Sequence, residues 1–264
     1  MTTADSNSTR RSRAAELLRL HTDPELLVVV NVWDVISATV VADVPGTKAL
    51  ATASHSIAAT LGYPDGEQIP VDLMIDMVGR IAAAVDLPVS ADLEAGYGDA
   101  GETVRRAIGV GIVGANLEDQ MKPLPEAAAA VAAAVNAGEA EGVPFVLNAR
   151  TDAFLKAGDR DRKDVIADAV ERGRAFLDAG AACVFVPGVT DVETIRQLVD
   201  GIGERKVSLM GGPGSPAIKE LEALGVARLS FGPWPQWAVM NSFADLGATL
   251  LTTGTLPDGV RPPR

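Results

Sequence analysis

Eight short apolar runs alternate with longer segments of helical periodicity along this chain, and that alternation limits the possible folds more than any other feature. The runs are almost continuously apolar, as expected of parallel strands that are covered on both faces. The predicted strands are 26–32, 49–53, 88–93, 114–118, 145–149, 182–186, 206–210 and 228–231. The predicted helices are 36–42, 71–85, 101–108, 126–141, 163–179, 192–202, 216–224 and 237–251.

Repeated strand–helix units suit either an open doubly wound sheet or a closed barrel. Eight units within residues 26–251 match the α/β class and its (β/α)8 TIM barrel, which takes about 250 residues. No Ser/Gly/Pro linker divides the middle of the chain, so we expect a single barrel domain over residues 14–255. Residues 1–13 are predicted to be a flexible N-terminal segment, and the Pro-rich residues 256–264 a C-terminal tail.

Composition excludes several classes of function. The 264 residues are 47% hydrophobic with a net charge of −12, which favours a globular protein and argues against a nucleic-acid partner. The apolar runs are too short to span a membrane, and residues 1–13 lack the pattern of a secretory signal, so we expect a cytoplasmic protein without a membrane partner. One cysteine and two histidines cannot form a zinc cluster, so a metal ion would be held mainly by oxygen.

Polar residues follow several predicted strands, at the end of a barrel where chemistry takes place. Asp92 and Glu94 point to one face because they are two residues apart, and Glu118 ends the adjoining strand. Three carboxylates this close repel one another unless a cation lies between them. Oxygen ligands with room for water favour Mg²⁺, with Mn²⁺ as a possible substitute. The alternative is that some of these acids only cap helices in the loops.

Two further segments suggest a substrate site. Arg150 ends the fifth predicted strand and is either a structural counter-ion or a clamp for a substrate carboxylate or phosphonate. Ser54 and His55 follow the second strand, where hydroxyls and backbone N–H groups can hold an anion, and the turn-rich loop 62–67 can act as a lid. Local backbone bonding by these serines is the competing interpretation.

Taken together and in this order, five segments resemble the isocitrate lyase and phosphoenolpyruvate mutase superfamily. They are residues 31–34, 61–65, 92–98, 117–120 and 148–152, and the resemblance runs from about Asn31 to Gly232. It implies that Asp92, Glu94 and Glu118 are the Mg²⁺-site acids, some of them acting through metal-bound water.

The same resemblance assigns the substrate site. It implies that Arg150 binds the substrate carboxylate and that Asp65 is the acid of a mobile gating loop. It also implies that the oxyacid end of the substrate is bound by Ala53, Ser54 and His55, with Trp33 nearby. We therefore expect Arg150, Asp65 and Ser54 to be the catalytic residues. Relatives form tetramers from dimers that exchange the last helix, which implies a homodimer or homotetramer here.

Departures from the family pattern leave the reaction open. The cysteine-containing loop of the isocitrate-type lyases is absent, because Met121-Lys122-Pro123-Leu124-Pro125 follows Gln120, and the Asn-Ser stretch of the phosphonomutases is also absent. Cys183 lies in another strand and cannot replace the missing cysteine. Ala53 stands where several relatives have serine, which weakens the anion grip.

The leading hypothesis is a Mg²⁺-dependent lyase or decarboxylase that cleaves a C–C bond of a small 2-hydroxy or 2-oxo di- or tricarboxylic acid through a pyruvate-type enolate. The first alternative is P–C bond chemistry, as in a phosphoenolpyruvate mutase or a phosphonopyruvate hydrolase. The second alternative is a non-catalytic protein of the same fold that binds an oxo acid.

Overall fold

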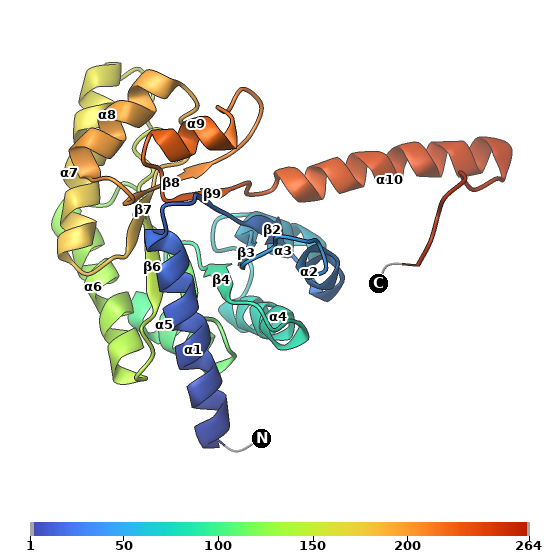
Figure 1. Ribbon diagram of the computed structural model, residues 1–264, viewed down its shortest axis with the longest axis horizontal. Coiled ribbons are helices and arrows are strands. Elements are labelled where there is room, and N and C mark those ends of the chain that lie inside the picture. The colour runs from blue at the N-terminus through green and yellow to red at the C-terminus, as the bar shows by residue number, and fades with distance from the viewer. Residues whose placement is uncertain (1–2, 263–264) are drawn as a thin grey trace.

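A closed parallel barrel forms the body of the protein, as the sequence predicts. The computed structural model describes residues 3–262, and within them the strands form one parallel sheet in the order β1-β9-β8-β7-β6-β5-β4-β3-β2. β1 and β2 are two parts of one strand on either side of Val29; β1 pairs with β9 and β2 pairs with β3. The first strand therefore closes the cylinder, and the helices surround it (Figure 1).

Every predicted strand and helix is present, with ends shifted by a few residues. The strands are Leu27–Val28 (β1), Val30–Val32 (β2), Leu50–Thr52 (β3), Val89–Asp92 (β4), Gly114–Glu118 (β5), Val146–Arg150 (β6), Cys183–Phe185 (β7), Val207–Met210 (β8) and Arg228–Ser230 (β9). The helices are Thr3–Thr22 (α1), Val35–Ala42 (α2), Ser54–Thr60 (α3), Val71–Ala84 (α4), Ala100–Gly109 (α5), Leu124–Ala140 (α6), Arg162–Asp178 (α7), Val192–Ile202 (α8), Ile218–Ala223 (α9) and Trp234–Thr253 (α10).

Aspartates start several of these helices. The Asp34 side chain accepts a hydrogen bond from the backbone N–H of Ser37 at the start of α2, and Asp99 accepts one from Glu102 at the start of α5. Such caps satisfy backbone donors that have no partner within the helix. Capping therefore explains a share of the acids in the βα loops, and Asp92 also accepts the backbone N–H of Ser54, the first residue of α3.

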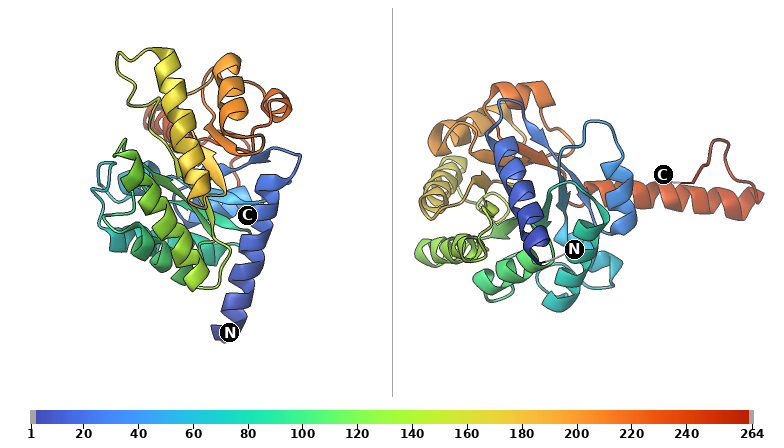
Figure 2. Two further views of the ribbon diagram at one scale, coloured as in Figure 1. Left: turned by 90° about the vertical axis from the view of Figure 1, so that its left-hand side faces the viewer. Right: turned by 60° about the horizontal axis from the view of Figure 1, so that its bottom comes forward.

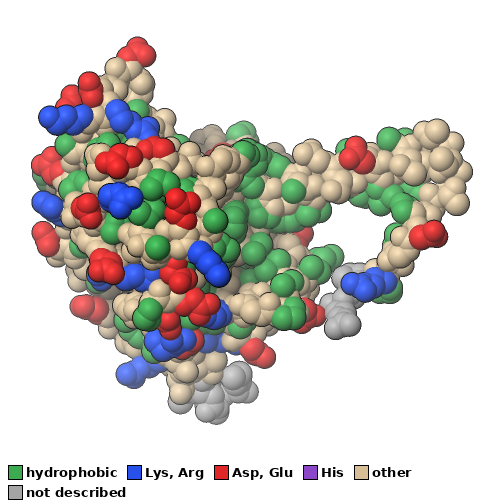
Figure 3. Space-filling view, turned by 45° about the horizontal axis from the view of Figure 1, so that its top comes forward, with side chains coloured by type: hydrophobic (Ala, Val, Ile, Leu, Met, Phe, Trp, Pro, Cys, Tyr) green, Lys and Arg blue, Asp and Glu red, His purple; other side chains and the backbone are tan. Residues whose placement is uncertain are grey.

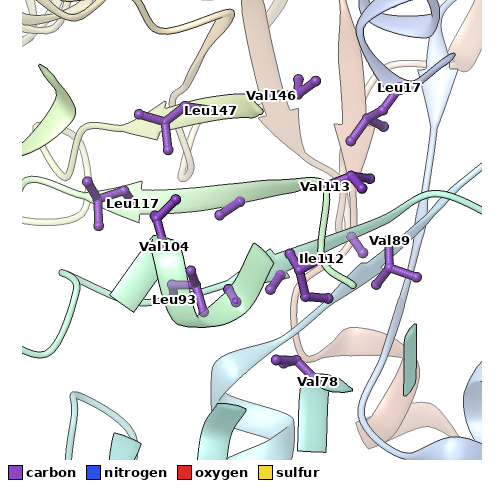
Figure 4. Packing of buried hydrophobic residues seen from close by; sticks show 14 of the residues in the cluster. Leu17, Val78, Val89, Leu93, Val104, Ile112, Val113, Leu117, Val146 and Leu147 are labelled. Carbon is purple, nitrogen blue, oxygen red and sulfur yellow. The ribbon is translucent and has the colours of Figure 1, made fainter. Parts of the chain in front are cut away.

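The N-terminal segment differs from its expectation, because α1 covers most of the residues that we expected to be flexible. Its buried side chains Ala14, Leu17 and Leu20 recur every three residues within a polar stretch and pack into the main hydrophobic core. Gly114 leaves room for Leu17, since a Cβ there would lie 2.7 Å from the Leu17 Cδ2 atom. Figure 4 shows Leu17 beside Val146 and Val113. From Ala14 onward, helix α1 thus packs against the end of the barrel where β5 and β6 begin.

A pH-dependent contribution to stability arises from His21 in α1. The His21 side chain is buried, and its Nδ1 atom lies 2.8 Å from the Leu17 carbonyl oxygen. Burial, together with the positive charge of Arg228, lowers the pKa of His21 to about 3. The unfolded chain therefore binds a proton that the folded protein excludes. We expect the free energy of unfolding to be highest above pH 6.5 and to fall by about 2 kcal/mol from this residue by pH 5.

Urea unfolding at pH 7.5 and pH 5 measures this effect. The His21→Gln variant should lose about 2 kcal/mol less than the native protein over this interval. An equal loss in His21→Gln and native protein would contradict the assignment.

Helix α10 leaves the body of the protein and projects outward (Figure 1 and the right-hand view of Figure 2). Gln236 is its buried residue, whereas Val239, Met240, Phe243 and Leu251 are exposed. Hydrophobic side chains also gather beside the base of this arm (Figure 3). Exposed apolar surface of this kind is typical of an interaction site. Within residues 3–262, no helix is both long and apolar enough to cross a membrane.

Candidate active site

A cavity of about 210 Å³ opens at the carboxyl ends of the strands. Such a volume suits a small acid. Its polar lining residues are Asn31, Ser54, His55, Asp65, Asp92, Asn116, Arg150 and Ser230, and its apolar ones include Ala53, Leu155, Phe185, Pro187, Met210, Pro233 and Trp237. The cavity therefore has one polar side and one apolar side, at the end of the barrel that carries chemistry in this fold.

Asp92 is held at the mouth of the barrel by α3. Its Oδ2 atom accepts hydrogen bonds from the Ser54 hydroxyl at 2.8 Å and the Ser54 backbone N–H at 3.2 Å. The Thr52 hydroxyl accepts the backbone N–H of Asp92 at 2.9 Å. Both lone-pair directions of Oδ1 stay free of these bonds, so Asp92 presents one carboxylate oxygen to the cavity.

Glu94 lies beneath the loop between α3 and α4. Its Oε1 atom accepts the Tyr97 hydroxyl at 2.7 Å, and its Oε2 atom accepts the backbone N–H of Glu67. The Glu67 carboxylate in turn accepts the Tyr97 backbone N–H at 2.5 Å. Glu94 adopts the left-handed conformation with φ +51°, which is uncommon for a residue other than glycine. The predicted lid thus rests on the acid cluster through Glu67.

Glu118 and Arg150 form an ion pair at the ends of β5 and β6. The Arg150 Nη1 atom is 2.9 Å from Glu118 Oε2, and Arg150 Nε donates to Asp152 Oδ1 at 2.8 Å. These side chains are largely buried, with 20% of Arg150 and 14% of Glu118 exposed. The remaining nitrogen, Nη2, makes no hydrogen bond to a described residue. Arg150 is thus a counter-ion for two acids, Glu118 and Asp152, and its role as a clamp for a substrate carboxylate stays a prediction.

Asp119, the residue after Glu118, has a structural role between two loops. Its carboxylate accepts backbone N–H groups of Met121 at 2.9 Å and Asp152 at 3.0 Å, and it pairs with Arg172 at 3.1 Å. The loops after β5 and β6 are thereby tied together. This bond network positions Asp152, and through it Arg150.

Electrostatics of the acid cluster fit a cation at this place. Burial raises the pKa of Glu118 to about 7; Asp92 and Glu94 add to the rise, and Arg150 opposes it. Burial also raises the pKa of Glu94, against the hydrogen bonds from Tyr97 and Glu67. A divalent cation nearby would stabilise the charged forms of both acids.

The three acids predicted to bind the metal ion are less closely grouped than the sequence suggests. Within the described residues, no three His, Cys, Asp or Glu side chains converge closely enough to bind one ion jointly. Asp92 alone of the three acids lines the cavity, while Glu94 and Glu118 are engaged by Tyr97 and Arg150. The arrangement fits an ion that keeps much of its water, as Mg²⁺ commonly does. The metal assignment of the three acids stays a prediction.

The other predicted site residues divide into two groups. Ala53, Ser54, His55, Asp65 and Arg150 all line the cavity, although Asp65 is exposed on its loop. The His55 ring lies edge-on to Trp237 at 5.5 Å between ring centroids. Trp33 packs against the hydrophobic core and is absent from the cavity lining.

Sequence reasoning missed the apolar side of the cavity. Phe185 and Met210 end β7 and β8 and look like core residues in the sequence, and Trp237 begins the last predicted helix. Their positions in the sequence could have revealed them, because Phe185 and Met210 end strands at the same edge of the barrel as Asp92. Asn31 also lies here: its Nδ2 donates to the Thr52 carbonyl at 2.8 Å, and its Oδ1 accepts the Phe231 N–H at 2.7 Å.

A barrel with acids and one arginine converging at its mouth defines a class of enzymes that act on small anionic substrates. Residues 17–251 match the phosphoenolpyruvate phosphomutase family, and the chain belongs to that family, within the isocitrate lyase and phosphoenolpyruvate mutase superfamily. This confirms the resemblance inferred from the motifs.

Relatives of known activity are carbon–carbon bond-cleaving enzymes. The chain is 28% identical to 2,3-dimethylmalate lyase of Eubacterium barkeri over 80% of this chain and 77% of that protein. It is 28% identical to oxaloacetate decarboxylase of Pseudomonas fluorescens over 96% of this chain and 94% of that protein. These relatives support a C–C lyase.

Solved structures agree with the fold. A Burkholderia cenocepacia protein provisionally described as a phosphonomutase is 38% identical, with a TM-score of 0.85 over 93% of this chain and 100% of that chain. Oxaloacetate acetylhydrolase in complex with its product oxalate is 28% identical, with a TM-score of 0.84 over 95% of this chain and 91% of that chain.

Proposed function

We propose that the protein is a Mg²⁺-dependent lyase or decarboxylase of a small dicarboxylic acid. With a 2-hydroxy acid, the hydroxyl loses its proton and becomes the carbonyl of the released oxo acid, and the electron pair of the broken C–C bond passes to the enolate of the second carboxylic acid. With a 2-oxo acid, loss of CO2 leaves the enolate of a small oxo acid. The observation that carries this proposal is the cavity in which Asp92, Ser54 and Arg150 face one another. Bound Mg²⁺, held by Asp92 and through water by Glu94 and Glu118, would supply fixed positive charge where the enolate develops.

The chain's own residues bind and orient the substrate. The Ser54 hydroxyl lies 2.8 Å from the Asp92 carboxylate, so Ser54 is directed toward the same oxygen-rich corner. Arg150 offers its free Nη2 donor to a substrate carboxylate while Glu118 and Asp152 hold the guanidinium in place. The lid that rests on Glu94 through Glu67 excludes water from the developing charge.

The proton needed at the end of the reaction comes from a group at the cavity. Cys183 is excluded, because it is completely buried in β7, its Sγ donates to the Lys206 carbonyl at 3.2 Å, and burial raises its pKa to about 12. Besides Asp92 and Arg150, the titratable residues lining the cavity are His55 and Asp65. We assign the proton transfer to Asp65, since the loop that carries it closes over the acids.

The cavity also restricts the substrate. Arg150 is the one Lys or Arg side chain lining it, so one carboxylate beyond the oxo-acid end can be neutralised. The apolar part of the lining, formed by Leu155, Phe185, Pro187 and Met210, suits an alkyl substituent and penalises a third carboxylate. We therefore propose an alkyl-substituted dicarboxylic acid, such as a 3-alkylmalate, in preference to a tricarboxylic acid.

A substrate panel tests this function. We expect pyruvate or a related oxo acid to be released from dimethylmalate faster than from methylisocitrate or oxaloacetate in the presence of Mg²⁺. Calorimetry with Mg²⁺ and oxalate, a mimic of the enolate, reports the site independently of turnover. No binding of oxalate would overturn the proposal, and binding without turnover of any compound would favour a non-catalytic oxo-acid-binding protein.

P–C bond chemistry is the second candidate function. It is favoured by the 38% identity to the protein provisionally described as a phosphonomutase. Phosphonopyruvate belongs in the same panel for this reason. Pyruvate from phosphonopyruvate alone would replace the lyase with this alternative.

We also propose that the protein is a homo-oligomer that pairs through α10. Met240 and Phe243 are 47% and 67% exposed on a helix that projects from the body. A second copy with the same helix buries this face reciprocally. We expect light scattering to give a dimer or tetramer for the native protein and a monomer for the double variant Met240→Glu/Phe243→Glu. A monomeric native protein would refute the pairing, and Asp245→Lys on the same helix is the matched control.

A further inference from the structure

Arg228 is a completely buried arginine inside the barrel, with 1% of its surface exposed. Its Nη1 atom donates to the Ser90 hydroxyl at 3.2 Å, from β9 on one side to β4 on the other. The Nε and Nη2 atoms have no hydrogen-bond partner among the described residues. Because these two nitrogens form one edge of the planar guanidinium, their N–H groups point in the same direction and can share one acceptor.

The position of Arg228 separates it from the substrate cavity. Arg228 pairs in register with Ser208 of β8, and Ser90 precedes the cavity residue Asp92 by two positions on the same face of β4. The guanidinium therefore lies in the layer below the cavity, toward α1. Its positive charge acts to lower the pKa of the His21 side chain in α1 and of the Cys183 thiol in β7. The His21 Nε2 atom likewise has no partner among the described residues.

No described carboxylate compensates this charge. The negative charge of Asp92 acts to raise the pKa of Arg228 from a distance. Asp92 Oδ2, however, accepts the Ser54 hydroxyl, and no ion pair joins Asp92 and Arg228. Burial lowers the pKa of Arg228 only to about 10, so the side chain is positively charged at neutral pH. An unpaired buried charge is strongly unfavourable.

Arg172 is another buried arginine, and its carboxylate partners provide a comparison with Arg228. It is also buried, and it pairs with Asp119 at 3.1 Å and with Asp168 at 2.9 Å. The fold thus supplies two carboxylates to one buried arginine and none to the other. The residues that the structure describes therefore supply no carboxylate partner to Arg228.

We propose that the Nε–Nη2 edge of Arg228 binds one small monovalent anion of the halide class, enclosed in the barrel core. A single water molecule would accept the two N–H groups but would leave the charge unbalanced. A larger oxyanion would bring further acceptors. Ser90 and Ser208 carry hydroxyl donors nearby, whereas the Asn148 amide already donates to Asn116 and Ser208. The site does not depend on the proposed catalytic function.

Anomalous diffraction tests the site in the native protein. Because the site is enclosed, the protein is unfolded in urea and refolded in sodium bromide without chloride before crystals are grown. We expect an anomalous peak in contact with both Nε and Nη2 of Arg228. A water molecule or a protein atom at this edge, with no anomalous signal, would overturn the proposal.

Thermal unfolding provides the second measurement. In protein refolded in gluconate and titrated with chloride at constant ionic strength, Tm should rise by roughly 3–5 °C for each tenfold increase in chloride above Kd. Arg228→Met should abolish the rise, and Arg172→Met, the matched control, should retain it. A chloride response that survives in Arg228→Met would assign the anion elsewhere and refute the proposal; where neither variant folds, the bromide experiment decides.

Discussion

Replacing Asp92 by Ala is expected to lower kcat/KM at least ~1000-fold while the protein stays folded. Asp92 is the carboxylate of the acid cluster that lines the cavity, and it holds Ser54 through two hydrogen bonds. The variant therefore removes the central metal-site acid and also releases the hydroxyl that faces the substrate. The structural loss is small, about 1–2 kcal/mol for two hydrogen bonds.

Three readouts separate these effects: the rate of oxo-acid release, calorimetry with Mg²⁺ and oxalate, and Tm. The Asp92→Ala variant should lose the first two and keep a cooperative unfolding transition. Asp72→Ala is the matched control, because Asp72 forms an exposed ion pair with Arg106 far from the cavity, and such pairs contribute little. Full activity in Asp92→Ala would show that the metal site is wrongly assigned.

Replacing Arg150 by Gln is expected to lower kcat/KM by at least about 100-fold, mostly through KM. The substitution removes the one guanidinium at the cavity and leaves Glu118 and Asp152 without their common partner. A neutral amide cannot balance a substrate carboxylate, so binding weakens. We also expect a loss of about 3 kcal/mol in the free energy of unfolding, because two largely buried acids lose a cation.

The Arg150→Lys variant distinguishes a clamp from a purely structural counter-ion. Lysine keeps the charge but cannot bond Glu118, Asp152 and a substrate in one plane. A clamp therefore predicts that Arg150→Lys recovers most of the stability and little of the substrate affinity. Recovery of both together would limit Arg150 to a structural role.

Much of the fold was predictable because parallel strands covered on both faces need continuous apolar runs. The runs that became β4, β5 and β8 were recognised within two residues of their ends. Helix α1 was missed, because its buried residues Ala14, Leu17 and Leu20 stand in a stretch rich in Ser, Thr and Arg. Three apolar residues spaced about one helical turn apart are weak evidence for an amphipathic helix, unless the surface against which they pack is known.

The candidate site was predictable for a different reason. Polar residues directly after apolar runs gather at one edge of a parallel barrel, so Asp92 and Arg150 could be placed together without coordinates. Their partners could not. Whether Arg150 bonds Glu118, Asp152 or a ligand depends on side-chain directions within a few ångströms, and the apolar wall of Phe185 and Met210 has the same sequence pattern as the core.

By itself, the order of residues determined the barrel, the superfamily and the acids at its mouth, because these depend on periodicity and on which residues end each strand. Only the tertiary structure decided that Glu94 is covered by the lid, that Arg150 keeps one donor free and that Arg228 is buried without a carboxylate. The physical reason is distance: pairing and desolvation of charges depend on groups that are far apart in sequence and meet only once the cylinder closes.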